Sequence, residues 1–434
     1  MTDDGTASDR PLERPGDRPG EGPAGGPAHG ASGGSPGGLP GPRPPARGAV
    51  AAVDAGVLAR ADEAVALLRA LVHLESPTGD ATAVGEVVAL LTATAATLPG
   101  ARCRTVPSAG GPHLVVDVPG HGAAGALPPV LLVGHADTVW PVGTLDGDVP
   151  WREEGDVLAG PGAFDMKSGL VVALTALAVL AEAGLDRRPA RLVVVADEEV
   201  GSSTGAAVVT EAAEGCAAVL GFEAPHADGA LKDARLGSTR VRLVVTGREA
   251  HAAVDPEKGV NAVDELVDQL LAVRQRLAAV ATEHPGTLLV NAGGVSGGGR
   301  ANVVPARAEA LLGLRFGDAD VEREVLGYLE ALVPVREGAT VAAEVLSHRP
   351  TWAPGAASAG LLAAVRAAGA AVGVAVEARP APGAADTNGT GALGLPTLDG
   401  LGPAGGGAHA VTEHLRVTSL LDRVRLVAVL LHTL

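Results

Sequence analysis

The apolar and polar positions of the chain follow two alternating periods from about residue 51 onward. Apolar residues recur every three or four positions in some segments, whereas short runs rich in Val and Leu, such as 130–133, indicate buried strands. The predicted helices cover 54–76, 81–98, 166–184, 203–213, 358–373 and 417–434. The predicted strands cover 113–119, 129–139, 190–201, 217–225 and 395–405. Strands that alternate with helices predict an α/β fold, in which a mostly parallel sheet is covered by helices on both faces.

The pattern changes between residues 237 and 347. There the segment 238–251 alternates polar and apolar residues, as does a strand with one face exposed. Further strands are predicted at 286–298, 306–316 and 339–348, and helices at 259–280 and 320–333. We therefore expect a four-strand, two-helix α+β domain at 237–347, inserted into a main domain formed by 49–236 and 348–434.

The composition narrows the possible partners and compartment. Residues 1–48 are dominated by Gly, Pro and charged residues, so we expect a disordered tail. The formal net charge of −17 argues against nucleic acid or an anionic membrane as a partner. No apolar run approaches the length of a membrane span. Two cysteines, Cys103 and Cys216, form neither a C-x-x-C motif nor a disulfide framework, which fits a reducing cytoplasm.

Residues able to bind metals or protons follow several predicted strands. His135 and Asp137 end the run at 129–139, and because side chains alternate along a strand they point to the same side. The other acidic groups are Asp165 in "GAFDMKSG", Glu198 and Glu199 in "VVVADEEVG" and Glu223 in "LGFEAP". Ligands of open α/β sheets bind outside the carboxyl ends of the strands, so these groups are expected to meet. His409 in "GGGAHAVTEH" is a candidate to join them from a distant loop.

The charge of this cluster favours a pair of divalent ions. Apart from Lys167, no basic residue lies beside these carboxylates in the sequence. Unpaired carboxylates packed together would have steeply raised pKa values. Two divalent ions would balance Asp165, Glu199, Glu223 and a bridging hydroxide. Oxygen and imidazole ligands without thiolate suit zinc, manganese or cobalt.

An ordered set of motifs identifies a family resemblance. The motifs are "GHADTV", "GPGAFDMKSG", "ADEEVGS", "GFEAP", "GREAH", "ANVVPARAEALLGLRF" and "GAHAVTEH". Together they resemble the co-catalytic zinc exopeptidases and deacylases, a family that includes acetylornithine deacetylase, succinyl-diaminopimelate desuccinylase, aminoacylase and bacterial glutamate carboxypeptidase. The likeness covers roughly residues 55–434. Within the family, "GHADTVWPVGTL" and "GFEAP" look most similar to glutamate carboxypeptidase.

The resemblance implies roles for the candidate metal ligands. Asp165 would bridge two zinc ions. His135 and Glu223 would complete one site, and Glu199 and His409 would complete the other.

The resemblance also implies catalytic and substrate-binding roles. Asp137 would hydrogen-bond the far nitrogen of His135 and so fix its tautomer. Glu198 would be the general base. The inserted domain would dimerise, so that His251 reaches the partner's active site and helps to stabilise the oxyanion. Asn302 and Arg315 lie where the family contacts substrate, with Arg315 at the carboxylate. Substrate-binding candidates of lower rank are Arg349, Asp386 and Asn388.

These assignments predict a cytoplasmic, homodimeric metallopeptidase that hydrolyses an amide bond next to a free carboxylate. A glutamate-carboxypeptidase-like exopeptidase is the main hypothesis. An N-acyl-amino-acid deacylase of the acetylornithine or succinyl-diaminopimelate type is the alternative, because sequence does not determine the shape of the substrate pocket. An inactive binding protein is a remote alternative, since every metal and base position is filled. A dinuclear phosphatase is disfavoured, because glycine loops at helix starts and clustered arginines for phosphate are not evident.

Overall fold

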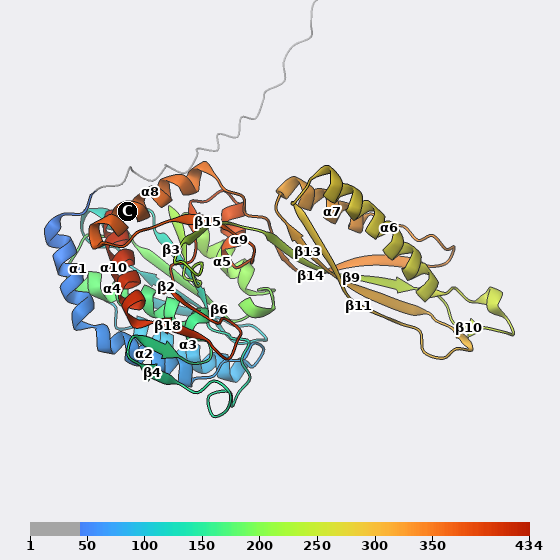
Figure 1. Cartoon of the computed structure of the whole chain (residues 1–434), viewed down its shortest axis with the longest axis horizontal. Helices are drawn as coiled ribbons and strands as arrows, with labels where there is room; N and C mark the ends of the chain where they lie inside the picture. Colours follow the sequence, from blue (N-terminus) through green and yellow to red (C-terminus); the bar gives the residue numbers. More distant parts are fainter. Residues whose placement is uncertain (1–43) are drawn as a thin grey trace, which may run out of the picture. The chain divides into compact units, whose positions relative to one another are not determined.

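The computed structural model describes residues 44–434. A six-stranded sheet lies among the helices of the main domain (Figure 1). The predicted disordered tail, 1–48, falls outside the described residues except for its last five, of which Arg47 already begins a helix. In spatial order the strands are β1 (Arg102–Val106), β2 (His113–Val118), β6 (Ala190–Val195), β3 (Val130–His135), β7 (Ala218–Gly221) and β16 (Thr397–Leu398). The pairings from β6 through β3 and β7 to β16 are parallel, and the two involving β2 are antiparallel. The prediction of an α/β fold with parallel central strands is confirmed.

Both faces of this sheet are covered because its central strands β3, β6 and β7 consist mainly of apolar residues. In β3, Leu132 packs into the larger core cluster, whereas Leu131 and Val133 pack into a smaller one. The smaller cluster is closed by α5 (Gly205–Ala213). The helices that contribute to the larger cluster are α1 (Arg47–Ala59), α2 (Ala61–His73), α3 (Ala81–Ala95), α4 (Ser168–Glu182), α8 (Ala356–Val372) and α10 (Val417–Thr433).

Two features of the main domain differ from the sequence-based expectation. The single helix expected at 54–76 is two helices, because the backbone at Arg60 leaves helical geometry (φ −103°, ψ 6°) although the apolar period continues across it. Strand β1 was not predicted, because its sequence "RCRTV" lacks an apolar run. The prediction also omitted several short elements. They are β4 (Arg152–Glu154), β5 (Val157–Ala159), β8 (Leu231–Arg235), β15 (Ala378–Ala381), β17 (Gly405–Gly406), β18 (His414–Arg416) and α9 (Thr387–Ala392).

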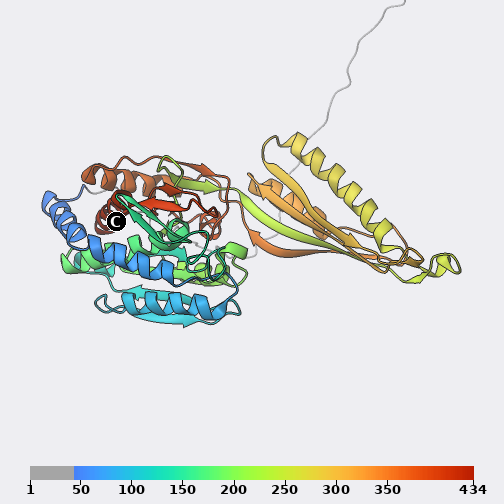
Figure 2. The same ribbon diagram turned by 60° about the horizontal axis from the view of Figure 1, so that its bottom comes forward.

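A separate antiparallel sheet is formed by residues between Gly237 and Arg349. Its strand order is β11 (Leu288–Gly297), β13 (Arg307–Phe316), β9 (Gly237–Thr246) and β14 (Thr340–Arg349). Alternate residues of β13 are buried, and they pack with α6 (Ala262–Glu283) and α7 (Ala319–Glu330) into a core of their own. Figure 2 shows α6 lying along this sheet. The strands β10 (Ala250–His251) and β12 (Val303–Val304) form a small antiparallel pair; in the chain β10 follows β9, and β12 lies between β11 and β13.

One helical stretch, Ala163–Glu182, has the length and hydropathy of a membrane span. Of its most apolar window, 89% is buried inside the fold. It contains α4, which packs against α1, α2 and α10, so its apolar character is that of a core helix.

Candidate active site

Five candidate ligands are brought to one edge of the main sheet by the topology. His135 is the last residue of β3, and Glu223 lies two residues beyond β7. Glu199 lies in the short helix η3 (Glu198–Val200), which follows β6. Because β3, β6 and β7 are parallel, their carboxyl ends meet at the same edge. Asp165 in η2 (Ala163–Lys167) and His409 in the loop after β17 complete the group.

Asp165 lies between two pairs of side chains, one facing each of its carboxylate oxygens. Its Oδ1 is 3.6 Å from Nε2 of His135, and that nitrogen is also 3.6 Å from Oε1 of Glu223. Its Oδ2 is 3.3 Å from Nε2 of His409, and that nitrogen is 3.2 Å from Oε2 of Glu199. The five side chains therefore form two three-residue groups that share Asp165.

The chemistry of these groups fits divalent metal ions. Ligand atoms of His135, Asp165 and Glu199 all lie within 4.8 Å of one another. Oε1 of Glu199 is buried and has no hydrogen-bond partner in the described part of the chain, which is costly unless another group binds it. All the atoms that face the centre are imidazole nitrogens or carboxylate oxygens, which zinc binds readily. The residues present therefore fit a metal pair.

The same proximity shifts the pKa values of the metal-free side chains. Burial opposes protonation of His135, but its contacts with Asp137 and Asp165 raise the pKa of the imidazole well above its usual value. Contacts with Asp165 and Glu199 raise the pKa of His409 to about 10. Burial raises the pKa of Glu223 to about 7. Despite its burial, the two imidazoles hold the pKa of Asp165 well below its usual value. Without metals, the two histidines thus hold the protons that partly neutralise the carboxylates.

Asp137 contacts both the histidine and the segment that carries Glu198 and Glu199. Nδ1 of His135 is 2.8 Å from the backbone oxygen of Asp137 and 3.4 Å from its Oδ1, so the closer acceptor is the backbone carbonyl. The carboxylate of Asp137 accepts hydrogen bonds from the backbone amides of Glu198 and Glu199 and from the hydroxyl of Thr78. Asp137 therefore holds η3 beside the end of β3.

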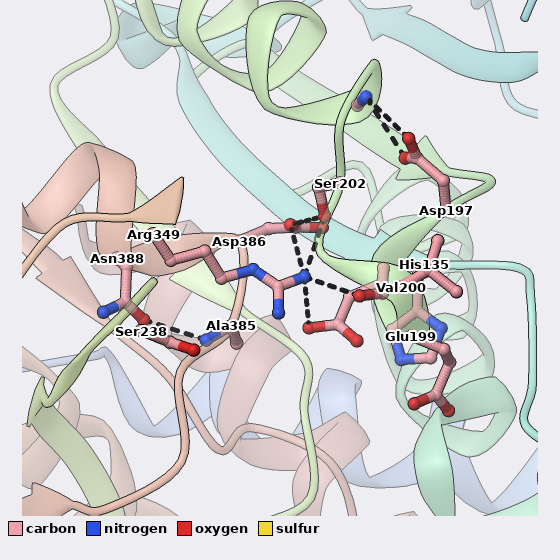
Figure 3. A network of polar contacts seen from close by, with 12 residues as sticks. His135, Asp197, Glu199, Val200, Ser202, Ser238, Arg349, Ala385, Asp386 and Asn388 are labelled. Atoms are coloured by element: carbon pink, nitrogen blue, oxygen red, sulfur yellow. Dashed lines mark hydrogen bonds and ion pairs between the residues drawn. The ribbon is translucent and has the colours of Figure 1, made fainter. Parts of the chain in front are cut away.

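Glu198 is buried and paired with an arginine that comes from the end of β14. Arg349 lies 2.8 Å from Oε1 of Glu198 and also donates to its backbone oxygen and to Ser202 (Figure 3). Asp386 lies 3.4 Å from the same guanidinium nitrogen. Lys167 is the basic neighbour of these carboxylates in the sequence, and the fold adds Arg349 as a second one in space. Burial raises the pKa of Glu198 well above its usual value, and the charge of Arg349 opposes that rise.

Two further arginines line a hollow next to this cluster. The hollow holds about 460 Å³ and is lined by Glu199 and by residues of the antiparallel sheet, among them Arg240, Arg315, Asn291 and Arg349. The pKa of Arg315 is lowered by burial and by the charges of Arg349 and Arg240, so the three guanidiniums lie close enough to repel.

Neither Arg240 nor Arg315 forms an ion pair with a carboxylate within residues 44–434. Arg240 donates to Ser347 and to the backbone oxygen of Val200, and Arg315 donates to Ser238. The hollow therefore presents two guanidiniums, those of Arg240 and Arg315, that form no ion pair with those residues, although Glu199 also lines it.

His251 and Asn302 lie together, but their contacts are local. His251 is exposed at the end of β10, and its Nδ1 accepts hydrogen bonds from two amides of its own turn. The backbone oxygen of Asn302 accepts a hydrogen bond from the amide of Ala252, the residue that follows His251. Within the described residues, neither side chain forms a hydrogen bond or ion pair with the cluster around Asp165.

Sequence reasoning missed several buried polar residues beneath the cluster. Asp399 pairs with Arg235 at 2.6 Å and accepts a hydrogen bond from the amide of Glu223. Glu413 accepts hydrogen bonds from the amide of Asp165 and from three other groups. Glu413 could have been noticed, because it lies four positions after His409 in the same motif, whereas the pairing of Asp399 with Arg235 has no local signal.

Known proteins are similar to this chain in both sequence and fold. Residues 131–433 match the model of Peptidase family M20/M25/M40. Carboxypeptidase G2 of Pseudomonas sp. (strain RS-16) is 30% identical over 374 residues, which are 83% of this chain and 86% of that protein. Succinyl-diaminopimelate desuccinylase of Gluconacetobacter diazotrophicus is 30% identical over 236 residues, 50% of this chain and 60% of that protein.

Solved structures show the same fold at lower identity. Aminopeptidase PepT of Bacillus cereus superposes with a TM-score of 0.65 at 20% identity, over 86% of this chain and 98% of that one. The M20 family metallo-carboxypeptidase Sso-CP2 of Sulfolobus solfataricus gives a TM-score of 0.58 at 17% identity, over 84% and 98%. The sequence match covers well over half of the chain, and the chain therefore belongs to Peptidase family M20/M25/M40, as a metal-dependent hydrolase.

Proposed function

We propose that this hydrolase carries two divalent ions, most simply zinc, and cleaves an amide bond next to an acidic residue such as glutamate. The proposal that the substrate is acidic rests on the hollow beside Glu199. Arg240 and Arg315 bring two positive charges that no carboxylate of the described residues neutralises. Two carboxylates on the released residue would supply the matching charge, and an arginine fork binds a carboxylate through two parallel hydrogen bonds.

The geometry supports the ligand roles expected from the resemblance. In this proposal His135 and Glu223 would hold one ion, His409 and Glu199 would hold the other, and Asp165, which lies between the two pairs, would serve both. The ions, when bound, would polarise the scissile carbonyl and acidify a water molecule.

Glu198 is proposed as the general base. Its carboxylate would accept a proton from water and later deliver it to the nitrogen of the leaving amine. A carboxyl group whose pKa is raised by burial is suited to both steps, because its pKa is shifted toward neutral pH. Arg349 would keep this carboxylate oriented through the contact at 2.8 Å rather than bind the substrate.

The inserted segment 237–347 is proposed to form a homodimer, which would bring His251 and Asn302 to the site of a second copy. Support comes from exposed apolar side chains on α6 and the edge strand β11, among them Leu271, Leu289 and Val295. Size-exclusion chromatography with light scattering tests this: Leu271→Asp would give monomers if the face is an interface. The protein is further proposed to be cytoplasmic.

The substrate proposal is tested with matched pairs of N-acyl amino acids that differ by one charge. We expect the zinc-loaded protein to hydrolyse N-benzoyl-glutamate at least tenfold faster, as kcat/KM, than N-benzoyl-glutamine. Arg240→Gln should reduce that ratio, whereas Arg242→Gln should not, because Arg242 lies on the same strand but is paired with Glu344. Equal rates on both substrates would exclude the acidic pocket, and faster hydrolysis of acetylornithine would favour the deacylase branch.

A further inference from the structure

Glu413 is a buried carboxylate that accepts four hydrogen bonds, and each of its oxygens accepts two of them. Oε1 accepts from the backbone amides of Phe164 at 2.9 Å and Asp165 at 3.0 Å. Oε2 accepts from the amide of Gly162 at 3.0 Å and from the indole Nε1 of Trp140 at 2.7 Å. The side chain is 0% exposed. All four partners are donors, so only an ionised acceptor satisfies them all.

These donors belong to separate segments of the chain, and each segment carries a proposed metal ligand. Trp140 lies five residues beyond His135. The three amides come from the segment that contains Asp165 itself. Glu413 lies in the loop of His409, and its amide closes that loop on Ala410. The carboxylate of Glu413 is therefore the point at which three ligand-bearing segments are tied together.

We propose that Glu413 is a positioning residue that fixes the Asp165 and His409 segments in the arrangement that binds both metal ions. The peptide of Asp165 is held directly by Glu413, and the two oxygens of Asp165 lie between the imidazoles of His135 and His409. A rotation of that peptide would move both oxygens away from both imidazoles. Loss of the Glu413 carboxylate therefore weakens both metal sites together, although Glu413 itself touches neither ion.

The inference rests on the proposed metal pair, and its test separates the two. Glu413→Gln keeps the shape of the side chain but sets an NH₂ group against N–H donors. Zinc affinity of wild type and variant is measured by competition with a chromophoric chelator. We expect both ions to bind about 10- to 100-fold more weakly in the variant, the range typical of groups that orient metal ligands. Saturating zinc should restore much of the lost activity.

A matched control removes a carboxylate that also accepts a hydrogen bond from a backbone amide but lies outside the three ligand-bearing segments. Asp156 accepts hydrogen bonds from the amide and hydroxyl of Thr418, each at 2.8 Å, in the turn between β4 and β5. Asp156→Asn should leave zinc affinity within twofold of wild type. Thermal unfolding of the metal-free proteins measures any general loss of stability.

Each outcome decides the inference. A wild-type protein without two bound ions would overturn the proposed function and the inference together. If the wild type binds two ions and the zinc affinity of Glu413→Gln is within twofold of the wild-type value, the inference alone is overturned. An equal loss of zinc affinity in Asp156→Asn would overturn it as well. If Glu413→Gln does not fold, Trp140→Phe removes one of the four donors. A more than twofold loss of zinc affinity in that variant supports the positioning role, and an unchanged affinity overturns it.

Discussion

Binding of zinc to the metal-free protein should release a number of protons that the structure specifies. His135 and His409 must lose their protons to become ligands, and both pKa values are raised, that of His135 well above its usual value and that of His409 to about 10. Glu223, with a pKa of about 7, is protonated below neutrality and ionised above it. Asp165 is already ionised, since its pKa lies well below its usual value. If both imidazoles start protonated, the ligands should release about three protons at pH 6 and about two at pH 8, because Glu223 ionises between these two pH values.

The sign of the pH dependence follows from these counts. The number of protons released equals the slope of the logarithm of the overall association constant against pH. Metal binding therefore strengthens as pH rises. For the two ions together, the slope should fall from about three decades per pH unit near pH 6 to about two near pH 8. Acid removes the metals because His135, His409 and Glu223 take up the protons again.

Calorimetry in buffers of different ionisation enthalpy measures the proton count directly. Glu198→Gln is the better background, because the raised pKa of Glu198 adds a proton that does not come from a ligand. In that background His409→Ala should release about one proton fewer at each pH. Release of fewer than one proton at pH 7 would refute the assignment of the two histidines, and a count that does not change from pH 6 to pH 8 would refute that of Glu223.

Three other predictions concern catalysis, assembly and packing. Glu198→Gln should keep both ions by metal analysis but lower kcat about 10²- to 10⁴-fold, and near-normal turnover would exclude the base role. His251→Ala and His409→Ala should each be inactive, yet regain activity when mixed as heterodimers; a mixture as inactive as its parts would exclude a shared site. Gly169→Ala should destabilise the protein in urea and weaken zinc binding, because its Cβ would lie 2.0 Å from the carbonyl oxygen of Phe222, beside Glu223. A stability within 0.5 kcal/mol of wild type, the ordinary range for neutral surface changes, would contradict this packing argument.

The candidate ligands that follow strands could be placed from sequence, because the direction of each strand determines the edge of the sheet at which it ends. His135, Glu199 and Glu223 each follow an apolar run, and parallel pairing of such runs leaves one arrangement of their ends. His409 does not follow a long apolar strand, since β17 before it is two residues long, so its place in the cluster was only a candidate until the family motif supported it.

Contacts between residues far apart in the chain could not be predicted. Arg349 contacts Glu198, which lies 151 positions away in the chain, and the sequence around neither residue indicates this contact. The break at Arg60 is hidden for a different reason: the apolar period runs through it, and the side chain is satisfied by ion pairs with Glu63 and Glu182. Periodicity reports which face of a segment is buried, but it does not report long-range polar pairing or a one-residue departure from helical geometry.

The antiparallel sheet is joined to the main domain through the ends of two neighbouring strands, β9 and β14. Ser238 at the start of β9 is paired in register with Arg349 at the end of β14, so the chain enters and leaves the sheet side by side. Arg349 is thus the last residue of β14 and at the same time the contact of Glu198. A displacement of the sheet would therefore move Arg349 and change its contact with Glu198. The position of the sheet and the orientation of Glu198 would then be coupled through the guanidinium of Arg349, and Arg240, which donates to the backbone oxygen of Val200, joins the same two parts.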